Sequence, residues 1–232
     1  ATINIAPGAT TGTATVAAPG DDPYIDASTV SATIATATGG NFESLQINPA
    51  AATTTVTDDV DATTVSLSAT ASVAEGGSIV YTATLTSAAD TPVTVTLSTG
   101  ETITIATGTT TGSVSIAAPA EDPYIDAGSV SRTITAATGG NFESLAINPA
   151  AATTTVTDTI DTTTVSITGD AIAAEGTTAG YSVSLTSPAQ TAVTVTLAYG
   201  GTAADGSDFT GVATVTIPAG ASSAALAIAT IN

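Results

Sequence analysis

The sequence has no histidine, cysteine, methionine or tryptophan, and Arg132 is its only basic residue. Without histidine, cysteine and lysine, the chain lacks the usual general bases, thiol nucleophiles and Schiff-base formers of enzymes. Paired carboxylates can hydrolyse glycosides, but such sites also hold aromatic platforms, and aromatic residues are 3% of this chain. We therefore expect no enzymatic activity, and disulfide bonds are excluded.

The shortage of basic residues leaves the 232-residue chain with a formal net charge of −19. So negative a surface repels phosphate backbones and anionic lipids, and we expect no nucleic-acid partner and no direct membrane insertion. No apolar run approaches membrane-spanning length, and no charged-then-apolar signal segment opens the sequence. If the protein is exported, we expect its export signal to lie outside these residues.

The sequence repeats itself at an offset of 100 residues, without a gap until about residue 200. The segments DPYIDA, TGGNFESL and INPAAATTTVTD recur closely, and SVAEGG recurs loosely. Within one copy, apolar residues alternate with Thr and Ser as in half-buried strands, and Gly and Pro mark the turns. About seven short strands in about 100 residues are typical of an immunoglobulin-like β-sandwich with Greek-key connections. The prediction is an all-β chain of tandem sandwiches, arranged end to end as a rod.

The predicted domains follow the repeat. Residues 61–160 form one complete copy, with strands A to G. Residues 1–60 correspond to strands D to G of a first copy, and residues 161–232 to strands A to E of a third, Calx-β-like copy. A sandwich that lacks half of its strands exposes its core and its sheet edges, so we expect the end copies not to fold alone. We interpret the chain as part of a longer array in which adjacent repeats are the partners.

The acidic residues gather in the loops at one pole of the predicted sandwich. Because successive strands alternate in direction, the A–B, C–D and E–F loops and the end of strand G share one pole of the sandwich, and 16 of the 20 acidic residues fall there. The predicted metal ligands among them are Asp21, Asp22, Asp26, Asp58, Asp61, Glu75, Glu121, Asp122, Asp126, Asp158, Asp161, Glu175 and Asp208.

This concentration of acids favours a bound cation. Two carboxylates about 4 Å apart repel each other by roughly 4 kcal/mol at an effective dielectric constant near 20. With a single arginine in the chain, such a cluster would splay apart or take up protons unless a cation neutralised it. Ca²⁺ takes six to eight oxygen ligands in irregular geometry, whereas zinc prefers His or Cys and Mg²⁺ prefers few carboxylates and retained water. We favour calcium, and solvation of acidic loops is the alternative.

Other residues carry weaker signals. Glu101 and Asp59 are weak candidate ligands because their counterparts in the other copies, Ala1 and Thr159, are not acidic. Glu43 and Glu143 lie in the F–G loop at the opposite pole, which faces the acids of the preceding copy; we favour a hydrogen-bonded turn, and completion of that metal shell is the alternative. The tyrosines of the two DPY segments are expected to pack the E–F loop down.

Several motifs together are similar to a known family. The segments TDTIDTTTVS, VAEGGSIVYTATLTS, TPVTVTLS, DPYIDA and TGGNFESLAINPA resemble the extender repeats of giant RTX-type adhesins of Gram-negative bacteria. The resemblance implies calcium-binding immunoglobulin-like domains that are exported by type I secretion to the bacterial cell surface. The third copy's GGTAADGSDFTGVATVTIPAG also resembles the Calx-β motif, which implies calcium ligation by Asp208 and Glu175. The first two copies lack the aspartate of this loop.

The expected function is structural. The repeats are predicted to be extracellular spacers, stiffened by calcium at each junction, that hold an adhesive module away from the cell for biofilm formation or host attachment. Two alternatives stay open. The repeats could themselves bind a ligand such as glycan or ice, which a glycan array or an ice-affinity test on a two-repeat fragment would reveal. Neighbouring copies could also polymerise into a filament by completing each other's broken ends.

Overall fold

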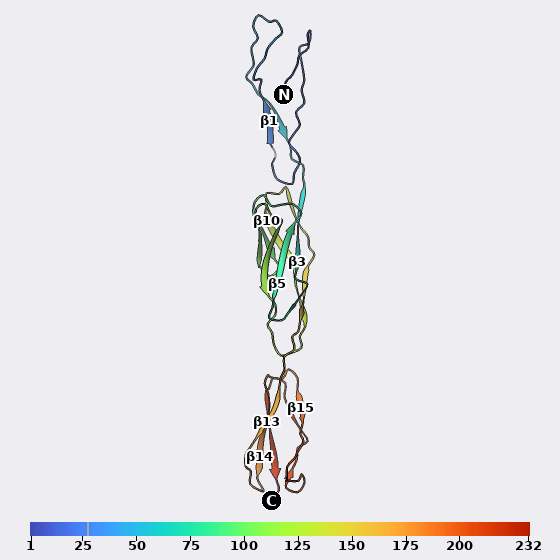
Figure 1. Ribbon diagram of the computed structural model, residues 1–232, viewed down its shortest axis with the longest axis vertical. Coiled ribbons are helices and arrows are strands. Elements are labelled where there is room, and N and C mark those ends of the chain that lie inside the picture. Colours follow the sequence, from blue (N-terminus) through green and yellow to red (C-terminus); the bar gives the residue numbers. More distant parts are fainter. Residues whose placement is uncertain (27) are drawn as a thin grey trace. The chain divides into compact units, whose positions relative to one another are not determined.

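A computed structural model describes residues 1–26 and 28–232, so Ala27, the last residue of the first DPYIDA segment, lies outside the described residues (Figure 1). The regular secondary structure of the described residues is entirely β-strand, which confirms the all-β prediction. The described residues contain no helix long and apolar enough to cross a membrane. The chain divides into two compact units, Ala1–Val73 with Ser78–Ala117 and Ser129–Thr155, and Ala74–Gly77 with Ala118–Gly128 and Val156–Asn232.

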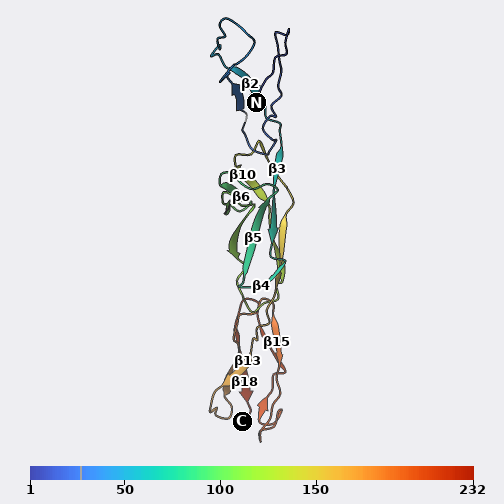
Figure 2. The same ribbon diagram turned by 45° about the horizontal axis from the view of Figure 1, so that its top comes forward.

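The second repeat forms an open sandwich in which every predicted strand is present. Its strands are β3 (Ala62–Ala69), β4 (Ser72–Ala74), β5 (Ser78–Leu85), β6 (Val93–Leu97), β7 (Thr102–Ile105), β8 (Thr111–Ala117), β9 (Gly128–Arg132), β10 (Ile134–Gly139), β11 (Ser144–Ile147) and β12 (Ala152–Thr157). They form three sheets with the orders β11-β3-β5-β8, β10-β6-β7 and β4-β12-β9. Figure 2 shows β3 and β5, which pair antiparallel, running side by side.

The alternation of the sequence places one face of each strand in the core. Val65, Ile79, Tyr81, Val95 and Ile105 are all fully buried, while the intervening Thr and Ser residues point mostly outward. β-Branched side chains suit this pleated, half-buried surface. The period-2 pattern therefore determines which face of each strand lies in the core.

The strands predicted as F and G are each divided in two. The chain changes sheets at Thr133, between β9 and β10, and the pairing of β10 with β6 then shifts register between Ile134 and Ala136. Between β11 and β12, Asn148 Oδ1 accepts a hydrogen bond of 3.0 Å from the N–H of Ala150. The intervening Pro149 has no N–H to donate to a ladder. β11 pairs parallel with β3, and β12, after this turn, joins a different sheet.

The first repeat forms only two strands, β1 (Ser28–Ala32) and β2 (Ala52–Val56), which pair with each other. They correspond to parts of strands F and G, whereas residues 1–26 contain no strand where D and E were predicted. In the second repeat the D and E strands, β7 and β8, pair with β6 and β5. Residues 1–60 include no counterpart of β5 or β6, so their backbone groups have no sheet to join.

The third repeat forms the predicted strands A to E and one short extra strand. These are β13 (Val165–Gly169), β14 (Thr178–Leu185), β15 (Val193–Thr196), β16 (Phe209–Thr210), β17 (Thr214–Ile217) and β18 (Ser223–Thr230). They form sheets with the orders β13-β14-β18-β16 and β15-β17, around buried Val183, Ile217, Leu226 and Ile228. This core is incomplete at its edge: Val165 is 46% exposed, whereas its counterpart Val65 is fully buried.

Candidate metal centres

The first acidic site, called here the Glu75 cluster, consists of Glu75, Glu121, Asp126 and Asp158. It is held where three segments of the chain meet. The N–H of Glu75 donates to the carbonyl of Thr157 (3.1 Å), next to Asp158, and the N–H of Gly76 donates to the carbonyl of Pro119 (2.7 Å). Gly76 has a φ of +68°, and a Cβ there would lie 3.6 Å from Cβ of Glu121. The glycine allows the left-handed turn that directs Glu75 toward the E–F loop.

The carboxylates of the Glu75 cluster approach one another closely. One oxygen from each of Glu75, Asp126 and Asp158 lies within 4.8 Å of the others. Glu75 is only 7% exposed. Its Oε2 and the Oδ1 of Asp158 are buried and have no hydrogen-bond partner among the described residues. A buried carboxylate oxygen without a partner is costly, so these two oxygens favour a cation or a hydrogen-bond donor beside them.

The same proximity raises the pKa of Glu75 to about 7. The largest cause is a hydrogen bond shared with the carboxyl group of Asp126, which requires one of the two to hold a proton. Burial and the negative charges of Asp126, Asp158 and Glu121 raise the pKa further. Glu75 is therefore protonated in part of the metal-free molecules near neutral pH, and a bound cation would favour its deprotonated form.

The donor set of the Glu75 cluster fits a hard divalent cation. Two oxygens bound to one Ca²⁺ at about 2.5 Å each lie at most about 5 Å apart, and the three oxygens here lie within 4.8 Å. All of the donors are carboxylates, which suits Ca²⁺, while the chain contains no His or Cys for zinc. Bound calcium would supply the positive charge that the unpartnered oxygens lack.

The second acidic site, called here the Asp58 cluster, consists of Asp21, Asp26, Asp58, Asp61 and Glu143. The N–H of Asp26 lies 3.4 Å from Oδ2 of Asp58, and the N–H of Asp61 donates to Oε2 of Glu143. The pKa of Asp21 is raised, first by the charge of Asp61 and then by burial and other acids. The pKa of Asp26 is raised by burial and by the acids at positions 22 and 58.

Glu143 belongs to the Asp58 cluster, although a hydrogen-bonded turn was the favoured prediction for its side chain. The hydrogen bond from the amide of Asp61 lowers its pKa, but burial and the carboxylates of Asp58 and Asp61 raise it more, so the net shift is upward. Its Oε1 is buried without a hydrogen-bond partner in the described part of the chain. This geometry places Glu143 beside the acids of the preceding repeat, as completion of their metal shell would require, and ligation of a metal by Glu143 stays a prediction.

The two clusters are related by the offset of 100 residues. Glu121, Asp126 and Asp158 are the counterparts of Asp21, Asp26 and Asp58. Each cluster also holds acids whose counterparts lie outside the other cluster: Glu75 in one, and Asp61 with Glu143 in the other. The structure thus shows three equivalent acids twice, with different additional carboxylates each time.

Comparison with protein families agrees with the repeat. Residues 1–59 and 61–159 each match the LapA domain. The chain belongs to the LapA domain family. LapA is a large adhesin involved in biofilm, so membership gives this chain an adhesin-related role at the cell surface or outside the cell. No individual curated protein matches the sequence.

Five predicted ligands of this LapA-family chain lie outside the close groups. Asp22 and Asp122 each accept a hydrogen bond from the amide two residues later, at 3.0 and 2.9 Å, and so shape the E–F loop. The charge of Asp22 nevertheless raises the pKa of Asp21. The others are Asp161, Glu175 and Asp208, which are exposed and are not in the described group of carboxylates within 4.8 Å.

Three further acids make hydrogen bonds within their own turns. In the loop of residues 200–211, Oδ2 of Asp208 accepts from the N–H of Ala204 (2.7 Å), and Oδ1 of Asp205 accepts from the N–H of Gly211 (2.7 Å). Glu101 accepts from the hydroxyl of Thr99, and this bond lowers its pKa. The carboxylate of Glu101 thus has its hydrogen-bond partner within its own turn.

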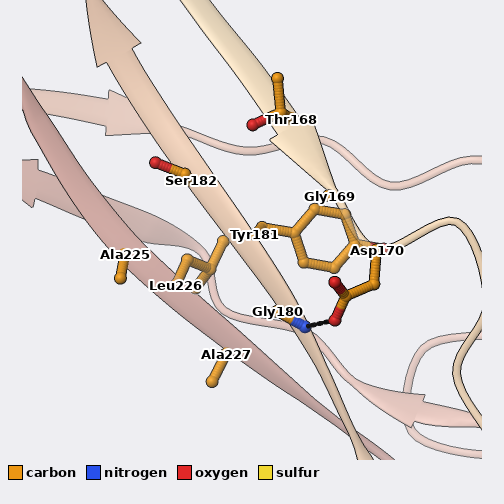
Figure 3. Close-up of a pocket in the computed structure, with 9 residues that line it drawn as sticks. All are labelled: Thr168, Gly169, Asp170, Gly180, Tyr181, Ser182, Ala225, Leu226 and Ala227. Atoms are coloured by element: carbon orange, nitrogen blue, oxygen red, sulfur yellow. Dashed lines mark hydrogen bonds between the residues drawn. The ribbon is translucent and has the colours of Figure 1, made fainter.

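A depression on β13, β14 and β18 of the LapA-family chain has a structural explanation (Figure 3). It opens over Gly180, whose counterpart in the second repeat is Val80. Its single charged side chain, Asp170, accepts a hydrogen bond of 2.8 Å from the N–H of Gly180. Thr70, the counterpart of Asp170, accepts in the same way from the N–H of Val80 at 3.1 Å. Asp170 therefore closes a strand end, as Thr70 does in the second repeat.

Proposed function

We propose that these repeats are spacer domains of a cell-surface adhesin and that calcium at the junctions between successive repeats makes them rigid. One observation carries the proposal. Asp58 and Asp61 belong to the end of the first repeat and the linker, whereas Glu143 belongs to the F–G loop of the second, and their carboxyl groups meet in one cluster. A cation held by both sides would restrain rotation at the linker.

The residues of the two clusters would hold the ion. Asp21, Asp26, Asp58, Asp61 and Glu143 offer carboxylates at one junction, and Glu75, Glu121, Asp126 and Asp158 do so at the other. Bound calcium supplies positive charge that offsets their mutual repulsion. The chain itself positions the oxygens through the backbone hydrogen bonds of Glu75, Gly76 and Asp61. It also buries part of each cluster, which strengthens the attraction to a cation.

The finer biological setting rests on the family and on the motifs. Membership in the LapA domain family supports an adhesin. The resemblance to RTX extender repeats supports export by type I secretion and a tandem rod that projects an adhesive module for biofilm formation or host attachment. The Glu- and Asp-rich junctions support a dependence on extracellular calcium. Calcium sites of extracellular modules have dissociation constants of about 10⁻⁴ to 10⁻³ M.

Small-angle scattering tests the stiffening. We expect the 232-residue chain to have a longer maximum dimension in calcium than in EDTA, because metal-free linkers bend. Glu143→Gln removes one carboxylate charge from the Asp58 cluster and should reduce this difference. Glu43→Gln is the matched control, since Glu43 is the exposed counterpart 100 residues earlier. Identical profiles of the wild-type chain in calcium and EDTA would contradict calcium-dependent stiffening.

The exposed ends favour a second candidate function, assembly with neighbouring copies. Ile34 and Leu45 of the first repeat are 59% and 47% exposed, and Val165 of the third is 46% exposed, whereas Ile134 and Val65 are buried in the second repeat. The first and third repeats therefore expose apolar side chains whose counterparts are buried within the second repeat. Light scattering over a range of concentrations should show growth of head-to-tail assemblies. A constant monomer mass up to high concentration would exclude them.

A further inference from the structure

A tyrosine outside the acidic clusters connects two successive repeats. The hydroxyl of Tyr24, in the first repeat, donates to the carbonyl of Ala88 in the second at 2.6 Å. The ring of Tyr24 stacks on that of Phe142, with ring centroids 5.7 Å apart and an interplanar angle of 22°. The sequence predicted that this tyrosine packs the E–F loop down, and the structure shows that its hydroxyl reaches a residue 64 positions away.

Backbone hydrogen bonds reinforce the aromatic contact. The N–H of Ile25 donates to the carbonyl of Asn141 (3.1 Å), and the N–H of Glu143 donates to the carbonyl of Pro23 (3.2 Å). The two segments thus pair as a short antiparallel bridge between Tyr24 and Phe142. We call Asp22, Pro23, Tyr24 and Ile25 the DPYI loop. All of these contacts join neutral groups, so none needs a cation.

The surface that receives the DPYI loop is formed by its own repeat. Asn141 has a φ of +57°, and its side-chain amide donates to Oδ2 of Asp90 at 3.1 Å. A Cβ at Gly140 would lie 2.2 Å from the ring of Phe142, so this turn requires glycine. The first repeat has the same turn, with a φ of +51° at Asn41. The turn therefore adopts this conformation with or without a docked loop.

The burial of the aromatic ring differs between the two copies of this turn. Phe142 is 7% exposed, with Tyr24 stacked on it, and also packs against its own repeat. Phe42, at the equivalent position of the first repeat, is 67% exposed. Phe142 and Phe42 therefore allow a comparison, within one chain, between this turn with and without a docked loop.

The contact recurs 100 residues later. The hydroxyl of Tyr124 donates to the carbonyl of Pro188 at 2.7 Å, again 64 residues away. Ala88 and Pro188 differ in side chain, but both offer the same backbone acceptor. The hydrogen bond therefore depends on the tyrosine and on the path of the backbone.

We propose that the DPYI loop is a docking segment and that the facing pole of the following repeat is its binding surface, formed by the carbonyls of Ala88 and Asn141 and the ring of Phe142. The partner of this surface is an Asp-Pro-Tyr-Ile turn of another repeat. The contact forms without metal. Because Pro23 also binds the amide of Glu143, docking brings that carboxylate to the Asp58 cluster before any ion binds. The proposal deepens the spacer function and shares its assumption that successive repeats are joined in a fixed geometry.

Amide hydrogen exchange of the full 232-residue chain in EDTA, read by NMR, tests the docking. We expect the amides of Ile25 and Glu143 to be protected in the wild type. Tyr24→Phe removes one hydrogen bond and should speed their exchange about fivefold. Phe142→Ala removes the stacked ring and should speed it roughly tenfold or more. Phe42→Ala, the same substitution at the exposed counterpart, should leave both rates unchanged.

The outcomes separate docking from metal binding. Protection of the amides in β5 shows whether each variant is folded. If Phe142→Ala unfolds the repeat, Tyr24→Phe still tests the docking, because it keeps the ring and removes only the hydroxyl. Exchange of both amides at unstructured rates in the wild type in EDTA would overturn the proposal, as would equal effects of Phe42→Ala and Phe142→Ala. The protection measured in EDTA does not depend on calcium. If calcium does not bind at all, the calcium proposal fails while the amides of Ile25 and Glu143 stay protected.

Discussion

Addition of calcium to the metal-free chain is expected to raise its free energy of unfolding by about 2.7 kcal/mol at a free concentration 100 times the dissociation constant. The physical reason is that the ion binds carboxylates that only the folded chain brings together. Glu75, Asp126 and Asp158 are far apart in sequence, yet one oxygen from each lies within 4.8 Å of the others. Thermal or urea denaturation, with calcium and with EDTA, measures this difference.

The repeat supplies a matched pair of variants for this experiment. Glu75→Gln removes one charge from the Glu75 cluster, so most of the calcium-dependent gain should disappear. The same variant should be at least as stable as the wild type in EDTA at neutral pH, because one like charge is gone. Glu175→Gln changes the exposed counterpart and should behave as the wild type. A full calcium response in Glu75→Gln would exclude Glu75 as a ligand.

Without calcium, stability is expected to fall as the pH rises from about 4.5 to above 7. The pKa of Glu75 is raised from 4.5 to about 7 in the folded chain, so the folded state holds its proton more tightly than the unfolded state. The resulting stabilisation is complete below the ordinary pKa and is lost as the pH passes the raised one. The raised pKa values of Asp21, Asp26 and Glu143 act in the same direction.

Denaturation in EDTA and in calcium, at a series of pH values from 4 to 8, measures this effect. Calcium binds the deprotonated carboxylates, so its presence should remove the fall above neutral pH. Glu75→Gln should flatten the EDTA profile, whereas Glu175→Gln should not. Glu101 has a lowered pKa, so its contribution is lost at acid pH instead. A stability in EDTA that rises steadily from pH 5 to 8 would contradict the raised pKa of Glu75.

The fold of the second repeat could be predicted closely because its signal is local. Alternation at Val65, Ile79, Tyr81 and Val95 specifies which side of each strand is buried, and all four are buried. The division of strands F and G could not be predicted in the same way, since it depends on which sheet has a free edge. In the first repeat, the sequence pattern of strands D and E is present but the strands are not formed. A strand needs a partner, and no local pattern supplies one.

The acidic sites were predicted in part. The repeat identified the E–F acids, the end of strand G and Glu75 as one group, and three of them meet closely. The role of Glu143 was weighed and not favoured, because its loop lies at the opposite pole of its own repeat. Its partners belong to the preceding repeat, so only the path of the chain from one repeat to the next reveals the contact. Glu175 and Asp208 have suitable sequence positions, but the structure leaves both exposed.

The sequence by itself determined the all-β class, the 100-residue repeat, the absence of the usual catalytic side chains and the restriction of acids to particular loops. These features depend on residue type and on spacing along the chain. The tertiary structure decided which carboxylates approach one another, and it decided that Tyr24 contacts Ala88 and Phe142. Electrostatic repulsion and aromatic stacking both act over a few ångströms. Spacing in the sequence does not fix such distances when loops from different strands and repeats converge.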